Sequence, residues 1–265
     1  MSSLNSVHVQ CTVVKRPNFF LVGAPKAGTT SLTRYLEQHP DIYMSPVKEP
    51  CFFSTEVRAE NFAEPAKGAG PVADWESYDA LFRDAGEAKA IGEASVCYLW
   101  SASAPGNVAR AIPEARILMV LRDPADRAFS QYVQGVAKGW IRCGFREHVE
   151  ASLRPHDGKF RITYPLLQMG EYAGQIRRYR EHFPEGQMHI RLYEDYQRDA
   201  PGFLRGVFGF LGVDTEFQPD MSRREHVYGD MRISAEDRRF LVEYYREGIR
   251  ELEGTIGRDL SAWLR

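Results

Sequence analysis

Short apolar runs alternate with amphipathic stretches along most of the chain. Phe19–Val22 and Arg116–Leu121 are nearly continuous apolar runs, which is typical of strands covered on both faces of a parallel sheet. Three more strands are expected over Asp41–Met44, Ala90–Ser95 and Met188–Tyr193. Between them, apolar residues recur at helical spacing, which predicts helices over Thr29–Gln38, Asp74–Arg83, Pro105–Ile112, Ala125–Ala137, Phe145–Leu153, Pro165–His182, Gly202–Leu211 and Ser234–Leu252. This alternation predicts an α/β fold with a mostly parallel central sheet flanked by helices.

The domain organisation is expected to be simple. The chain has 265 residues, of which 43% are hydrophobic, and this suffices for a large core. Residues 17–265 show no linker and no repeat, so they are expected to form a single domain. Residues 1–16 are polar and are expected to be a disordered or frayed tail. Residues 56–73 are rich in Ala, Gly and Pro and should form a mobile connection.

Charge and cysteine content narrow the class of protein. A net charge of −2 argues against a nucleic-acid partner, and no apolar run is long enough to span a membrane. The first sixteen residues lack the apolar core of a signal peptide, and the four cysteines show no C-x-x-C pairing. We therefore expect free thiols and a cytoplasmic enzyme. The histidines show no metal-ligand spacing, so no metal is expected, and the oligomeric state is not indicated.

The first motif follows the strand at Phe19–Val22. A turn rich in small residues, which includes Pro25, Ala27 and Gly28, leads into the helix at Thr29. The first N–H groups of a helix lack intrahelical partners and favour an anion. Lys26 adds a positive charge, Gly28 permits close approach, and three hydroxyls follow at Thr29, Thr30 and Ser31. The stretch therefore predicts a phosphate cradle.

This cradle differs from the usual nucleotide-binding loop. Gly23 and Gly28 have the spacing of G-x-x-x-x-G-K-[ST], but Thr29 stands where that motif has its lysine, which here has moved to Lys26. The displaced lysine argues for a phosphorylated ligand other than the nucleotide of a kinase. A plain strand-to-helix turn is the alternative.

The second motif follows the strand at Arg116–Leu121. Arg122 leaves the carboxyl edge of the predicted sheet, and Ser130 lies about two turns into the next helix. A guanidinium matches phosphate oxygens bidentately, so the pair predicts a second phosphate site. Two alternatives stay open. Asp123 could hold Mg²⁺ as in a Walker B motif, or Arg122, Asp123 and Arg127 could form a surface ion-pair cluster.

Together the two motifs resemble sulfotransferases that use 3′-phosphoadenosine 5′-phosphosulfate (PAPS). The resemblance covers about Phe19 to Leu211. It is nearest to the heparan sulfate N- and 3-O-sulfotransferase domains and their soluble bacterial relatives, and it implies the P-loop nucleotide-kinase-like fold of that family. It implies a 5′-phosphosulfate loop over 25–31 and a 3′-phosphate site at Arg122 and Ser130. Tyr193, within Leu192-Tyr193-Glu194-Asp195, is a further cofactor residue, and Arg223 and Arg224 are candidates in a C-terminal loop.

The resemblance also implies the catalytic groups. Glu49 in Glu49-x-x-Phe52-Phe53 matches the proposed base, and Lys26 would stabilise the leaving phosphate oxygen. Acceptor contacts are expected from Lys48, Phe53, Glu93 and Tyr98. The alternative for Glu49 is a loop carboxylate paired with Lys48 or solvent, and the alternative for Glu93 is a buried structural role.

Two departures concern the acceptor. Cys51 stands where the glycan enzymes often have His, and Ala94 where they often have Lys, so groups that could grip a sulfated glycan are missing. We expect a small or medium acceptor, a bacterial metabolite or carbohydrate, modified at a hydroxyl and less readily at an amine. The competing functions are a P-loop kinase and a non-catalytic PAPS- or nucleotide-binding module.

Overall fold

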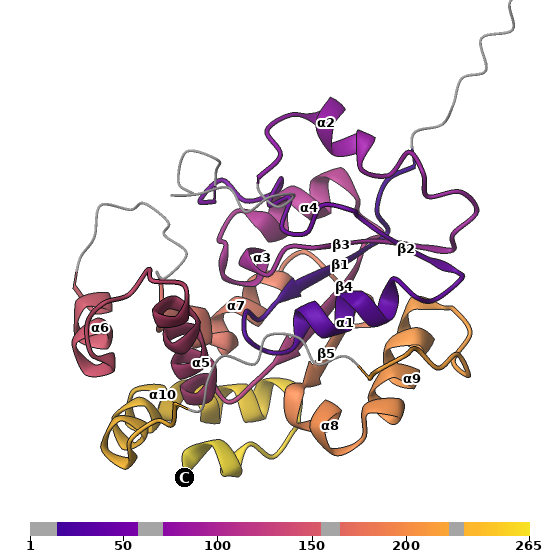
Figure 1. Cartoon of the computed structure of the whole chain (residues 1–265). Helices are drawn as coiled ribbons and strands as arrows, with labels where there is room; N and C mark the ends of the chain where they lie inside the picture. Colours follow the sequence, from indigo (N-terminus) through magenta and orange to yellow (C-terminus); the bar gives the residue numbers. More distant parts are fainter. Residues whose placement is uncertain (1–14, 58–70, 155–164, 223–230) are drawn as a thin grey trace, which may run out of the picture.

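The computed structural model describes residues 15–57, 71–154, 165–222 and 231–265, and its centre is a five-stranded sheet (Figure 1). The strand order is β2-β3-β1-β4-β5, and every neighbouring pair is parallel. The strands are β1 (Phe19–Gly23), β2 (Ile42–Met44), β3 (Ala90–Ala94), β4 (Arg116–Leu121) and β5 (Met188–Leu192). All five coincide with expected strands, so the α/β prediction is confirmed.

The middle of the sheet is covered on both faces. Every residue of β1 and β3 is buried, which explains why these strands do not alternate between apolar and polar residues. Figure 1 shows α1 in front of the sheet and α7 behind it. The strands pack closely: a Cβ added to Gly92 in β3 would lie 2.1 Å from the Phe19 ring. The strand ends are therefore rigid platforms for the loops that follow them.

Most helices occur where the apolar periodicity predicts them, but three points differ. The helix expected from Pro165 is wrong at its start, because the chain makes a 3₁₀ turn at Gln168–Gly170 before α7 begins at Tyr172. Two helices, α3 (Cys97–Trp100) and α8 (Tyr193–Arg198), were not expected, because α3 has only four residues and the buried side chain of α8 is the polar Asp195, so neither shows an apolar period. The others are α1 (Thr29–Leu36), α2 (Trp75–Ala80), α4 (Ala104–Ala111), α5 (Pro124–Ala137), α6 (Phe145–Ser152), α7 (Tyr172–Arg180), α9 (Ala200–Leu211) and α10 (Ala235–Ile256), with 3₁₀ turns at Glu185–Gln187 and Ser261–Leu264.

The loop after β2 is tied to the segment between α3 and α4. The Glu56 carboxylate accepts hydrogen bonds from Ser101 Oγ (2.6 Å), Ser103 Oγ (2.7 Å) and the Ala102 N–H (2.9 Å). Although burial raises it, the bonds from Ser101 and Ser103 lower the pKa of Glu56 to about 2. Residues 45–57 are thus an ordered loop. The centre of the expected connection, residues 58–70, lies outside the described residues.

The N-terminal segment is described only from Lys15. Residues 1–14 of the expected tail lie outside the described residues, whereas the Arg16 guanidinium bonds to the Asp79 carboxylate at 3.0 Å. Among the helices that the structure describes, none has the length and apolar character needed to cross a bilayer.

Candidate active site

Two motifs that lie far apart in the sequence meet at the carboxyl edge of the sheet. Arg122 follows β4, and its Nη1 donates to the Lys26 carbonyl oxygen, which follows β1, at 3.0 Å across 96 positions of sequence. The Arg122 guanidinium also lies 5.1 Å from the centre of the Tyr193 ring, directly after β5. The carboxyl ends of parallel strands form the usual ligand site of such folds. The two cationic motifs therefore lie next to each other at this edge.

The loop after β1 opens into the N-terminus of α1. Gly28 is the N-cap residue and has φ +80°, a conformation that favours glycine, and a Cβ there would lie 2.9 Å from the Tyr193 ring. Gly28 has no side chain with which to cap the first turn. Thr29 is buried, while Pro25, Lys26, Thr30 and Ser31 are partly exposed. The first N–H groups of the helix can therefore receive an anion beside these hydroxyls.

Lys26 lies in a concentration of positive charge. Its Nζ donates to Gln134 Oε1 on α5 at 3.2 Å. Burial, followed by the charges of Arg122, Arg127 and Lys48, lowers the pKa of Lys26 to about 8. The lowered pKa therefore reports first the burial of the amine and second the repulsion from neighbouring cations. A phosphate or sulfate bound here would relieve that repulsion.

The two arginines beside Lys26 bond to neutral acceptors. Arg127 is fully buried, and its guanidinium donates to Gln131 Oε1 at 2.6 Å and to the Leu166 carbonyl oxygen. Its Nε has no partner among the residues that the structure describes. In the part of the chain that the structure describes, neither Arg122 nor Arg127 forms an ion pair with a carboxylate. Their charge therefore remains available to a bound anion.

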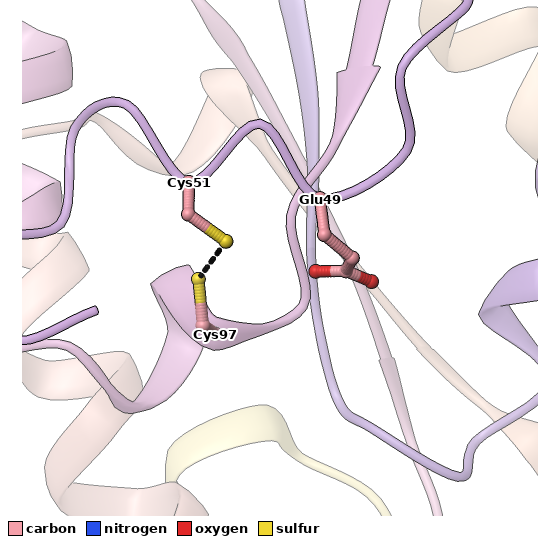
Figure 2. A group of neighbouring side chains, drawn as sticks. All are labelled: Glu49, Cys51 and Cys97. Carbon is pink, nitrogen blue, oxygen red and sulfur yellow. Dashed lines mark hydrogen bonds between the residues drawn. The ribbon is translucent and has the colours of Figure 1, made fainter. Parts of the chain in front are cut away.

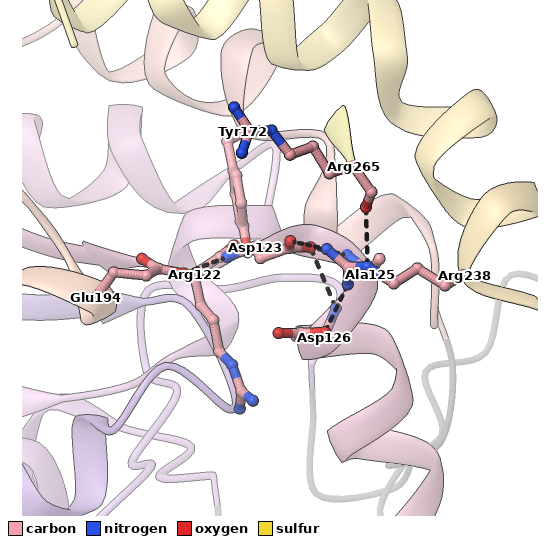
Figure 3. Close-up of polar contacts among 8 residues, drawn as sticks. All are labelled: Arg122, Asp123, Ala125, Asp126, Tyr172, Glu194, Arg238 and Arg265. Atoms are coloured by element: carbon pink, nitrogen blue, oxygen red, sulfur yellow. Dashed lines mark hydrogen bonds and ion pairs between the residues drawn. The ribbon is translucent and has the colours of Figure 1, made fainter. Parts of the chain in front are cut away.

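The corner after Arg122 is fixed from several sides (Figure 3). Asp123 caps α5 by accepting the Ala125 N–H at 2.9 Å, and Arg238 on α10 bridges Asp123 and Asp126 at 2.7 Å each. Arg238 also donates to the Arg265 backbone oxygen at 3.0 Å. Figure 3 further shows Tyr172 and Glu194 against the backbone of this corner, where the Tyr172 hydroxyl donates to the Arg122 carbonyl and Asp123 N–H donates to Glu194 Oε1, both at 3.0 Å.

These contacts argue against both alternative interpretations of the second motif. Both Asp123 oxygens are engaged by α5 backbone donors and by Arg238, so the residue acts as a helix cap rather than as a Walker B ligand. Arg127 is buried and bonds to Gln131, so Arg122, Asp123 and Arg127 do not form a surface ion-pair cluster.

Glu49 is anchored beside the same edge. Its N–H donates to the Ala94 carbonyl at 2.9 Å, and its Oε2 accepts the Val96 N–H at 2.8 Å. Its Oε1 accepts from Lys48 Nζ at 2.6 Å, and 23% of its side chain is exposed. Glu49 is thus paired with Lys48, as the alternative interpretation of a paired loop carboxylate predicts. Its contacts also fix the carboxylate in one orientation that solvent can reach.

Three predicted acceptor residues lie deeper in the protein. Phe53, Glu93 and Tyr98 are 4%, 0% and 0% exposed. Glu93 accepts from Ser95 Oγ at 2.6 Å and from the Tyr78 hydroxyl, and burial raises its pKa to about 7. The Tyr98 hydroxyl accepts the Phe53 N–H at 3.1 Å. In this arrangement they support the Glu49 loop, and their contact with an acceptor stays a prediction.

The structure also identifies residues that the sequence analysis missed. Arg127 and Gln134 share one face of α5 with the predicted Ser130, which is partly exposed. Their spacing of three and four positions from Ser130 was the available signal. Arg238 lies on a distant helix and had no local signal. The predicted Arg223 and Arg224 lie outside the described residues.

One group of side chains has the composition of a metal site. Ligand atoms of Glu49, Cys51 and Cys97 lie within 4.8 Å of one another (Figure 2). Neither histidine spacing nor a C-x-x-C pair marks this group, because its residues come together from two loops.

Comparison with known proteins assigns the family. The model described as the sulfotransferase family matches residues 17–218. The crystal structure of a sulfotransferase from Alicyclobacillus acidocaldarius is 37% identical, with a TM-score of 0.86, and the match covers 95% of this chain and 100% of that one. The sulfotransferase domain of the Synechococcus PCC 7002 olefin synthase, with a TM-score of 0.57 and 17% identity over 92% of this chain and 96% of that one, shares the fold.

Curated relatives include enzymes of heparan sulfate modification. Bovine bifunctional heparan sulfate N-deacetylase/N-sulfotransferase 2 is 26% identical over 96% of this chain and 31% of its own length. Mouse heparan sulfate glucosamine 3-O-sulfotransferase 3A1 is 27% identical over 92% of this chain and 64% of its own length. The chain thus spans about a third of the first relative and less than two thirds of the second.

Replacing Arg238 by Met should destabilise the fold. The change leaves Asp123, whose side chain is 6% exposed, without its cationic partner. Breaking such a pair costs about 3 kcal/mol, which corresponds to a fall in Tm of about 6–10 °C in a chain of this size. Calorimetry measures the shift. Arg246→Met is the matched control on α10, because its partner Glu243 is 71% exposed. Equal shifts in the two variants would contradict the assigned role of Arg238.

Proposed function

The chain belongs to the sulfotransferase family, and we propose that its donor is PAPS and its acceptor a hydroxyl group of a small or medium molecule. One observation carries the choice of donor: Arg122 bonds to the backbone of Lys26, so two cationic motifs share one edge of the sheet. A donor with phosphate groups on both the 3′ and the 5′ oxygen of its ribose needs two such sites. The chemistry of the residues present fits this donor.

The proposed binding roles follow the two motifs. The loop at 25–31 receives the 5′-phosphosulfate on the N–H groups of α1, with Lys26 beside the bridging oxygen. Arg122 and Ser130 receive the 3′-phosphate, and Tyr193 covers Gly28. Arg223 and Arg224 remain candidates for the same phosphate. Bound PAPS supplies the sulfuryl group that moves to the acceptor.

The proposed catalytic roles belong to Glu49 and Lys26. Glu49 accepts the proton of the attacking hydroxyl, because its carboxylate is fixed by the Val96 N–H and partly exposed. Lys26 stabilises negative charge on the leaving phosphate oxygen. Lys48 bonds to Glu49 and orients it. No metal is needed in this scheme.

The acceptor is proposed from the chemistry of the Glu49 loop. The named relatives act on heparan sulfate, which suggests that carbohydrates belong on the acceptor list. Cys51 and Ala94 are both buried, so neither position offers a charged group to a sulfated glycan. We therefore favour an uncharged small or medium alcohol, a sugar included, over an amine. We further propose a cytoplasmic location, in keeping with the free thiols at Cys51, Cys97 and Cys143.

Binding and turnover test the proposal against its competitors. Calorimetry with adenosine 3′,5′-bisphosphate in EDTA should show tight binding, whereas a kinase would need Mg·ATP. Labelled PAPS incubated with a panel of alcohols, sugars and amines should then yield a sulfated product. Binding without transfer to any member would support the non-catalytic module instead.

Ligand affinity should depend on the charge of Lys26. A phosphate beside Nζ favours the protonated amine. The free protein loses this proton above pH 8, because the pKa of Lys26 is about 8, whereas the complex keeps it. Affinity for adenosine 5′-monophosphate should therefore fall as the pH rises from 8 to 9, by up to about tenfold. In Lys26→Arg the charge does not titrate, so the affinity should stay constant. If the wild-type protein binds adenosine 5′-monophosphate equally well at pH 7 and pH 9, the proposed contact between Lys26 and the phosphate is wrong.

Arg122→Gln should weaken only ligands that carry the 3′-phosphate. Loss of a charged hydrogen-bond donor should reduce affinity for adenosine 3′,5′-bisphosphate about 10- to 100-fold. Affinity for adenosine 5′-monophosphate should be unchanged. Arg110→Gln, at an exposed position of α4, is the control and should affect neither ligand. An equal loss for both ligands would place Arg122 elsewhere in the site.

Glu49→Gln should lower kcat about 100-fold or more while leaving adenosine 3′,5′-bisphosphate affinity unchanged, because the amide keeps the shape but cannot take a proton. Labelled PAPS and the acceptor found in the panel provide the assay. The matched control is Glu87→Gln, since the Glu87 side chain is fully exposed. Full turnover in Glu49→Gln would exclude Glu49 as the base.

A further inference from the structure

Two cysteines from different loops meet beside Glu49. The Cys97 thiol donates to Cys51 Sγ at 3.1 Å. Figure 2 marks this contact with a dashed line. Both are free, and both are buried, at 2% and 4% exposure. Neither thiol has a part in the proposed transfer reaction. Their proximity therefore needs an explanation of its own.

The segments that carry these cysteines are the ones that hold Glu49. Glu49 N–H bonds to the Ala94 carbonyl, Val96 N–H bonds to the Glu49 carboxylate, and Cys51 N–H bonds to Ser95 Oγ at 3.0 Å. Glu49 and Cys51 both have positive φ, at 60° and 50°, so this short stretch has a constrained backbone. A change in the distance between the two sulfurs must therefore be absorbed by the anchors of Glu49.

A metal is the weaker explanation of the cluster. Two thiolates on one tetrahedral zinc, each about 2.3 Å from the metal, lie about 3.7 Å apart, which is farther than the observed 3.1 Å. The bond from Cys97 lowers the pKa of Cys51, but burial and the charges of Glu49 and Glu93 outweigh it, and burial raises the pKa of Cys97. Both thiols therefore rest protonated, and zinc ligation and oxidation alike begin with the loss of a proton, so the distance between the sulfurs decides between them. The two sulfurs need to approach each other by only about 1 Å to reach the length of a disulfide bond.

We propose that Cys51 and Cys97 form an oxidation site, at which a hydroperoxide converts the two thiols into a disulfide that displaces Glu49 and reduces turnover. One sulfur attacks the peroxide oxygen, which gives a sulfenic acid and one water from hydrogen peroxide. The second sulfur then attacks the sulfenic sulfur, forms the S–S bond and releases a second water. The two thiols lose two electrons and two hydrogens, and both leave in water.

The effect on turnover rests on the proposed function of Glu49. A misplacement of about 1 Å at a catalytic group costs up to about 100-fold in rate. Oxidation should therefore lower kcat by 10- to 100-fold. The cation cluster at Lys26 and Arg122 belongs to other loops, so affinity for adenosine 3′,5′-bisphosphate should change less than twofold.

The experiment treats the full chain with hydrogen peroxide and follows bond formation separately from turnover. The oxidised protein should lose 2 Da and yield a peptide pair that joins Cys51 to Cys97. Dithiothreitol should restore both the mass and kcat. Cys51→Ser and Cys97→Ala should each abolish the cross-link and the reversible loss of rate. Mapping the cross-link in the wild-type chain needs no variant to fold.

The outcomes separate the two proposals. If peroxide oxidises other cysteines and leaves Cys51 and Cys97 as thiols, the oxidation site is excluded whatever the enzyme does. If the disulfide forms and kcat does not change, the coupling to Glu49 is excluded. Stoichiometric zinc in the purified protein, with thiols that react only after chelation, would show a metal site instead. If the reduced enzyme transfers no sulfuryl group, the proposed function is wrong. The mass measurement still shows whether the disulfide forms.

Discussion

Repulsion among cations at one edge of the sheet is the constraint around which the site is built. Lys26 repels Arg122 and Arg127 where water cannot screen them, and this repulsion adds to burial in lowering the pKa of Lys26. The fold tolerates the repulsion by offering neutral acceptors: a backbone carbonyl to Arg122, and Gln131 with a second carbonyl to Arg127. The nearby carboxylate of Asp123 is instead bound by Arg238. Positive charge is thus kept for a ligand, while negative charge is neutralised within the protein.

The sequence predicts the parts of this arrangement that depend on local pattern and on one topological rule. Buried strands show as apolar runs, and all five were visible. The rule that parallel strands end at one edge brings Lys26, Glu49, Arg122 and Tyr193 together without any coordinates. Of the two unexpected helices, α3 has four residues, about one turn, and α8 is mostly polar, with Asp195 as its buried residue. Neither carries an apolar stripe that could be recognised in the sequence, so their absence from the prediction has a physical cause.

Contacts between distant elements could not be predicted in the same way. Arg238 meets Asp123 because α10 packs on α5. No local pattern in either segment predicts how the two helices align. The meeting of Cys51 with Cys97 depends on strand order: β2 lies beside β3, so the loops after them run together. The sequence predicts that both strands exist but does not predict that they are neighbours. A thiol pair formed across two such loops therefore has no signature in spacing.

The site divides into two halves that are held by different parts of the fold. The cations are fixed by β1, β4, α5 and α10, through carbonyl oxygens, Gln131 and Arg238. Glu49 is fixed by the β3–α3 segment, and its loop is tied further by Glu56 to the serines before α4. Glu49 and Cys51 have left-handed backbones that need such external support. The hydrogen bonds that fix the two halves come from different residues, so the acceptor side can change its loop while the anchors of the side that binds phosphate stay in place. A cross-link within the Glu49 half should then act on the acceptor side alone.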